Sequence, residues 1–140
     1  MNLKSAPYIS NAVLRIALGV TMVMIGISAY RDLAPFLANV TDGLLGWSSR
    51  IAYLWGFILP ALLIFGGGLL AIGRYQFLAA WAGGLAIGSV PIGIVLKTIM
   101  TGLPLPDAMA AIYPSIVWLI AFVLAFTTLP EEPPAAAEEE

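Results

Sequence analysis

The sequence predicts an all-α integral membrane protein: a bundle of four transmembrane helices, with a short amphipathic helix at the membrane surface between the first and the second. Hydrophobic residues make up 61% of the 140 residues and charged residues only 10%, against about 25% charged residues in a soluble domain. The apolar residues gather into segments near the roughly 20 residues that a helix needs to cross the hydrocarbon core. They form one domain, 1–130, with spans at about 10–30, 51–73, 75–97 and 108–129.

The first span follows a polar N-terminal segment that contains Lys4. Asn11 and Arg15 interrupt the apolar run, and both lie near its start. Because no A-x-A-like cleavage site follows the run, we expect a retained helix and not a cleaved signal peptide.

Residues 31–50 are more polar than the spans and contain proline and glycine. Five apolar residues nevertheless recur at helical spacing on one face: Leu33, Phe36, Leu37, Val40 and Leu44. This pattern predicts a short amphipathic helix at the membrane surface, with Asp32 as its N-cap and Trp47 as an interfacial anchor. The alternative is an irregular loop.

The second and third spans are joined by the short turn 73–76. A link this short makes the two helices antiparallel neighbours. Pro60 and Pro91 lie inside these spans, and each removes one backbone hydrogen bond and tends to kink its helix.

The fourth span follows the loop 98–107, with Asp107 as the predicted N-cap and Pro114 in the first two turns. The segment 131–140 contains two prolines, three alanines and five glutamates. It cannot bury apolar area, so we expect an acidic, disordered tail; docking of this tail on a basic partner is the alternative.

Four spans place both termini on one side of the membrane. The positive-inside rule gives a tie, because three basic residues fall on each side: Lys4, Arg15 and Arg74 on the terminal side, Arg31, Arg50 and Lys97 on the other. Arg15 and the free N-terminus favour cytoplasmic termini.

Small residues recur at a spacing of four in the second and third spans. Gly67 and Ala71 form one such pair; Ala80, Gly84 and Gly88, with Gly93 further on, form the other. In lipid, small residues let helix backbones approach closely. The pattern predicts packing inside the bundle, with docking of a partner helix as the alternative.

The chain contains no cysteine and no histidine, and no Asp or Glu falls inside a predicted span. Thiol chemistry and most zinc, haem and copper sites are therefore excluded, and intramembrane proton relays are disfavoured. We predict no catalytic residue and no metal site. The net charge of −2 gives no sign of nucleic-acid binding.

Three residues are candidates for contact with a lipid or quinone: Arg15, Trp81 and Trp118. Arg15 could bind an anionic or polar head, although snorkelling to the interface is the simpler interpretation. The two tryptophans lie deeper in their predicted spans than the other aromatic residues, which fit an aromatic belt at the membrane surface. Arg74, in the turn, is predicted to cap carbonyls at the end of the second span.

Residues 15–19 (Arg-Ile-Ala-Leu-Gly) followed by Gly26, and the glycine-rich stretch 66–73, resemble the first two helices of DoxX-like membrane proteins. The resemblance covers about 14–126. It implies a four-helix bundle in a bacterial or archaeal inner membrane, and some members are subunits of thiosulfate:quinone oxidoreductase. Many members carry an acidic residue just before the glycines of helix two, whereas 61–65 contains none. The resemblance therefore carries no catalytic residue onto this chain.

Three functions follow as hypotheses. The first is a non-catalytic accessory subunit of a respiratory or photosynthetic membrane redox complex, which contacts membrane lipids and other integral membrane subunits. The second is a subunit of a quinone-linked sulfur-oxidising enzyme, and the third is an oligomeric carrier of lipids or small solutes.

Overall fold

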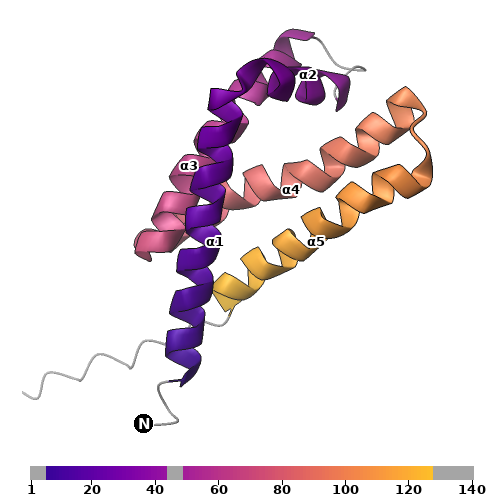
Figure 1. Cartoon of the computed structure of the whole chain (residues 1–140). Coiled ribbons are helices and arrows are strands. Elements are labelled where there is room, and N and C mark those ends of the chain that lie inside the picture. The colour runs from indigo at the N-terminus through magenta and orange to yellow at the C-terminus, as the bar shows by residue number, and fades with distance from the viewer. Residues whose placement is uncertain (1–5, 44–48, 128–140) are drawn as a thin grey trace, which may run out of the picture.

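The computed structural model describes residues 6–43 and 49–127, which form five helices (Figure 1). They are α1 (Ala6–Arg31), α2 (Leu33–Gly43), α3 (Ser49–Ile72), α4 (Gln76–Thr101) and α5 (Leu105–Thr127). All except α2 are long and apolar enough to cross a membrane. The structure is 94% helical and no described residue lies in a strand, so the predicted all-α bundle with four membrane-spanning helices is confirmed.

The short helix α2 lies across one end of the bundle (Figure 1) and contacts both α3 and α4. Of its predicted apolar face, Leu33, Phe36, Leu37 and Val40 are half-buried. The carbonyl of Asp32 accepts a hydrogen bond from the Phe36 amide at 3.3 Å, as expected of a residue that immediately precedes a helix. The remaining residues of this prediction, Leu44 and Trp47, lie outside the described residues, as does the tail 131–140.

The start of α5 differs from the prediction. The helix begins at Leu105, and the carbonyl of Pro104 accepts hydrogen bonds from the amides of Asp107 and Ala108. Asp107 therefore lies within the first turn and is not the N-cap. Its carboxylate there still lies near the positive end of the helix dipole.

Helices α1 and α3 pack closely because glycines remove side chains from their contact. A Cβ on Gly19 would lie 2.5 Å from the carbonyl oxygen of Gly67 and 2.9 Å from Cβ of Ala71. Two turns further along α1, a Cβ on Gly26 would lie 2.7 Å from the Pro60 carbonyl oxygen. Gly67 and Ala71 therefore do pack inside the bundle as predicted, and their partner is α1.

The turn between α3 and α4 uses two left-handed residues. Gly73 ends α3 with φ of 77° and Tyr75 precedes α4 with φ of 54°. Glycine adopts this conformation freely, whereas tyrosine does so only at a cost. Away from the turn, Gly66 of α3 faces Gly83 of α4. A Cβ on Gly66 would lie 2.5 Å from the backbone nitrogen of Gly83, so the two helices also touch backbone to backbone.

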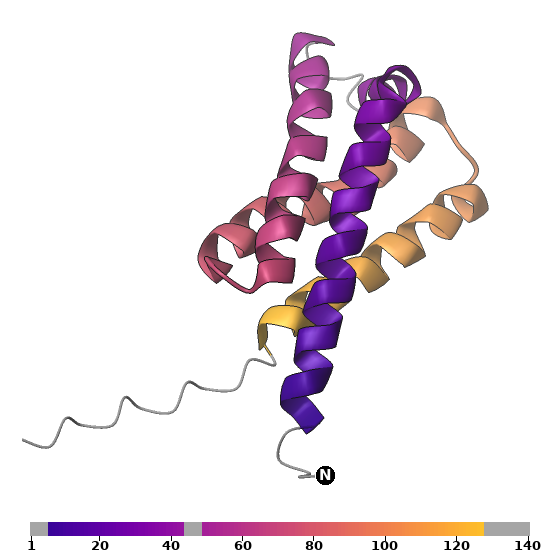
Figure 2. The ribbon, with the colours of Figure 1, turned by 60° about the vertical axis from the view of Figure 1, so that its left-hand side comes forward.

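Helices α4 and α5 form a hairpin that runs obliquely to α1 and α3 (Figures 1 and 2). Within the described chain, α5 meets α1 near its C-terminal end, where the Asn11 side-chain amide donates to the Ala125 carbonyl at 3.4 Å. The buried core lies in the same half of the bundle. It consists of Leu18, Met22, Leu63, Leu70, Ala79, Ala86, Ile87, Phe122 and Ala125.

Pro60, Pro91 and Pro114 all lie inside helices, as predicted. Pro60 cannot donate to the carbonyl four residues earlier and crowds that turn of α3. The neighbouring carbonyl, that of Phe57, accepts a hydrogen bond from the Tyr30 hydroxyl at 2.8 Å. This bond ties the end of α1 to the altered turn of α3.

Candidate ligand pocket

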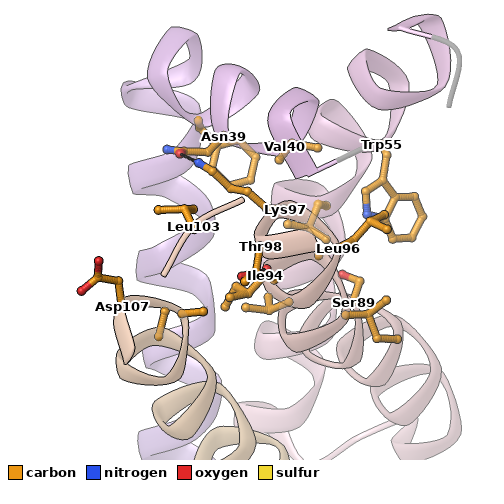
Figure 3. Close-up of a pocket in the computed structure, with 17 residues that line it drawn as sticks. Asn39, Val40, Trp55, Ser89, Ile94, Leu96, Lys97, Thr98, Leu103 and Asp107 are labelled. Atoms are coloured by element: carbon orange, nitrogen blue, oxygen red, sulfur yellow. Dashed lines mark hydrogen bonds between the residues drawn. The ribbon is translucent and has the colours of Figure 1, made fainter. Parts of the chain in front are cut away.

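A cavity of about 520 Å³ lies beneath α2, at the end of the bundle opposite the α3–α4 turn. We call it the main pocket (Figure 3). Its apolar walls come from α2 (Phe36, Val40), α3 (Trp55, Leu59), the second half of α4 (including Gly93, Ile94 and Leu96) and the start of α5 (Ala108, Ala111). The volume is within the range of roughly 300–1,000 Å³ found for pockets that hold one small molecule.

One end of the main pocket is polar. The Lys97 ammonium donates a hydrogen bond to Asn39 Oδ1 at 2.9 Å and lies 3.5 Å from Asp42 Oδ2. These two contacts connect α4 to α2, and Figure 3 shows the one between Lys97 and Asn39. The Lys97 side chain is 28% exposed and that of Asp42 is 49% exposed, so the cluster lies where the pocket meets the surface.

Three other polar side chains of the pocket already donate one hydrogen bond each. The hydroxyls of Ser89 and Thr98 donate to carbonyls of their own helix at 2.8 Å, and the Asn39 side-chain amide donates to the Pro35 carbonyl at 3.1 Å. An ammonium carries three donor hydrogens, and Lys97 has two partners among the described residues. Lys97 can therefore donate a further hydrogen bond and is the charged donor here; the second amide hydrogen of Asn39 and the indole N–H of Trp55 are uncharged donors of the same lining.

Arg15 lies elsewhere, at the opposite end of the bundle. Its guanidinium lies beside Gly73, where a Cβ would clash with it. Its Nε is buried and has no hydrogen-bond partner among the described residues. A cation here lies at the C-terminal end of α3, where the helix dipole is negative.

This arrangement corrects the role predicted for Arg74. Arg74 is exposed and makes no hydrogen bond to α3 within the described residues. The cation beside the end of α3 is Arg15, from a different helix, because the close α1–α3 contact brings it there.

The two candidate tryptophans do not line the main pocket. Trp118 lines a smaller apolar cavity of about 250 Å³ between α1 and α5, together with Leu14, Leu18 and Thr21. Trp81 is 58% exposed, and its ring meets that of Phe77 edge to face at 6.3 Å. Arg15, Trp81 and Trp118 are thus not brought together into one site.

Sequence reasoning missed the main pocket. In the sequence Lys97 enters only as one of the basic residues that decide orientation, and no pattern links it to Asn39 and Asp42. The available signal was the amphipathic helix itself, because Asn39 and Asp42 are its polar residues near a predicted span end that also carries a cation.

The small residues predicted on α4 do not form the internal contact. The buried face of α4 consists of Ala79, Ala82, Gly83, Ala86 and Ile87. A Cβ on Gly84 would lie at an ordinary 3.6 Å from the Phe122 ring, and a Cβ on Gly88 or Gly93 would meet nothing within 4 Å. Ala80, Gly84 and Gly88 therefore form a half-buried stripe beside the packed face, which we call the outer stripe, while Gly93 lines the main pocket.

Among the described residues no group of three Asp, Glu, His or Cys side chains is placed to hold a metal ion. No protein-family model, curated protein or solved structure matches this chain. The resemblance to DoxX-like proteins therefore stays a prediction.

Proposed function

We propose that the protein is a non-catalytic accessory subunit of a larger membrane redox complex, respiratory or photosynthetic, in a bacterial inner membrane. It packs against other integral membrane subunits through the outer stripe of α4 and holds a lipid or quinone in the main pocket. Its termini are cytoplasmic. The redox setting and the bacterial membrane come from the resemblance to DoxX-like proteins.

The observation that carries this proposal is the unused outer stripe. A glycine in a helix interior costs about 1 kcal/mol relative to alanine, and Gly88 gains no close contact inside the described chain in return. Trp81 and Leu85, beside the stripe, are 58% and 49% exposed. Small residues flanked by large apolar ones are the surface on which a second transmembrane helix packs closely.

Replacement of Gly88 by leucine tests the docking. Extraction in a mild detergent and native mass measurement should give a complex with other membrane polypeptides for the wild type, and a free protein for Gly88→Leu. Gly68→Leu, on α3, is the matched control, because a Cβ there also meets nothing within 4 Å. A wild-type protein that runs only as a monomer or homo-oligomer contradicts the proposal.

The main pocket supports a second candidate, an oligomeric lipid carrier. The two functions differ in what the purified protein does alone. A carrier moves labelled lipid between vesicles without a partner, whereas an accessory subunit does not, so a transfer assay on the homogeneous protein separates them.

A further inference from the structure

We infer that the main pocket binds one uncharged amphiphile whose polar end carries a hydrogen-bond acceptor, such as a ketone or ester carbonyl, and that Lys97 donates to this acceptor. The inference names the site and the chemical class of the ligand within the proposed function, and to that extent it rests on it. Glycerides and alkylquinones share this chemistry.

The shape of the pocket fits an amphiphile. Its lining runs along α4 from Lys97 at the surface to Ser89, which is about 12 Å at 1.5 Å per residue. Lys97, Asn39 and Asp42 lie together at one end, and Leu59, Ile94 and other apolar side chains line the rest. A molecule with a polar head and an apolar tail matches both parts at once.

The available donor selects the head. Ser89 and Thr98 direct their hydroxyl hydrogens to their own helix, so neither donates to a ligand without losing that bond. Lys97 retains a donor hydrogen after its contacts with Asn39 and Asp42. A head that accepts a hydrogen bond can therefore be satisfied here, and the ammonium is the charged donor among the described residues that line the pocket.

The charges favour an uncharged head over an anionic one. Lys97 is the only cation that lines the pocket among the described residues, and Asp42 already lies 3.5 Å from it. Asp107 adds a second carboxylate at the pocket margin, and in Figure 3 it points away from Lys97. An anionic head would compete with Asp42 for one ammonium and would be repelled by both carboxylates.

Binding is measured by native mass spectrometry of the purified full chain in detergent. The probes are monooleoylglycerol, an alkyl benzoquinone of similar chain length, and oleate, which presents the anionic head. We expect one molecule of an uncharged probe per chain and at least about tenfold weaker binding of oleate. The relative affinities of the glyceride and the quinone distinguish the two sources of the ligand; oleate binding as tightly as both overturns the inference.

Two variants that fill the pocket locate the site. Gly93→Leu extends a side chain into the pocket from a position where a Cβ meets nothing within 4 Å. Gly88→Leu is the control, because a Cβ there also meets nothing within 4 Å but the residue does not line the pocket. Gly93→Leu should weaken the uncharged probe at least about tenfold, and Gly88→Leu should leave it unchanged. Ala111→Leu, which fills the pocket from α5, with Ala110→Leu as its control, replaces this pair if Gly93→Leu does not fold. Equal losses in a filling variant and its control overturn the assignment.

Two further variants test the head contact. Lys97→Met keeps a chain of similar length but removes the donors, and should weaken the uncharged probe about tenfold. Asp42→Asn frees the ammonium from its carboxylate and should remove most of the discrimination against oleate. An unchanged preference in Asp42→Asn, or unchanged binding in Lys97→Met, contradicts the role given to Lys97.

These results are separable from those on the accessory-subunit function. If Gly88→Leu loses its partners but keeps the probe, while Gly93→Leu does the reverse, both proposals stand. Loss of partner association alone leaves the ligand site intact, and loss of specific probe binding leaves the docking surface intact.

Discussion

Gly19 is the residue whose missing side chain decides the spacing of α1 and α3. Its Cβ would lie 2.5 Å from a carbonyl oxygen of Gly67 and 2.7 Å from the backbone nitrogen of Ala71. Because both are backbone atoms, neither can move without moving α3. Gly19→Ala should therefore lower the free energy of unfolding by about 1–3 kcal/mol, measured by thermal or denaturant unfolding in detergent.

Gly68→Ala is the control for that substitution. It lies one residue from Gly67 on the same helix, and its Cβ would meet nothing within 4 Å. Alanine should be neutral or stabilise α3 by up to about 1 kcal/mol. Equal effects of the two substitutions would show that the α1–α3 contact is looser than described.

Arg15 and Arg74 form a matched pair at the α3–α4 turn. Arg15→Met removes the cation beside the C-terminal end of α3 and should destabilise the turn by about 1 kcal/mol. Arg74→Met removes an exposed cation and should change stability by less than about 0.5 kcal/mol. Amide exchange at residues 73–76 measures both, and a larger effect from Arg74→Met would restore the predicted capping role.

At the scale of the element, the attachment of α2 depends on Gly56. A Cβ there would lie 2.5 Å from Cδ2 of Leu37, so α2 packs directly over the backbone of α3. Gly56→Val should displace the Leu37 side chain, weaken its contact with α3 and raise amide exchange across 33–43, with Gly68→Val unchanged as the control. If exchange in α2 does not rise, the contacts of Lys97 hold the helix by themselves.

The existence and order of the helices were predictable from sequence, whereas the packed face of α4 was not. Long apolar runs give spans by length alone, and the short turn at 73–76 makes α3 and α4 neighbours. Two adjacent faces of α4 are both small, however: Ala79, Ala82, Gly83 and Ala86 on one, Ala80, Gly84 and Gly88 on the other. In a soluble protein, polar residues would mark the exposed face of the helix. In lipid both faces can be apolar, so the spacing of small residues does not show which face packs inside the bundle.

The site was less predictable than the fold for a related reason. Four helices line the main pocket. At its polar end Lys97 contacts Asn39, which lies 58 positions away in the sequence. Each of these residues reads as ordinary interfacial polarity by itself. Their relation appears only when α2 folds back over α4.

For the whole molecule, the arrangement predicts that the α3–α4 turn and the α1–α2 connection lie on opposite sides of the membrane. The chain contains no native cysteine, so single cysteines report accessibility without further substitution. With cytoplasmic termini, an impermeant maleimide should label Asp32→Cys from outside the inner membrane. Arg74→Cys should react only after that membrane is opened.

The two possible contrary outcomes have different meanings. Reversed labelling contradicts the proposed orientation but keeps the four-span topology. Labelling of both positions from the same side contradicts the topology itself.

The oblique hairpin of α4 and α5 has a mechanical consequence. It touches α3 backbone to backbone at Gly66 and Gly83, and α4 continues from Gln76 to Lys97 for about 32 Å. Measured from this contact, α4 therefore extends further toward α2 than toward the α3–α4 turn. A small rotation about this contact displaces the far end of α4 most, and Lys97 and α2 contact α4 there. If a neighbouring subunit tilts α4, the residues at the opening of the main pocket therefore move further than those at the contact with α3.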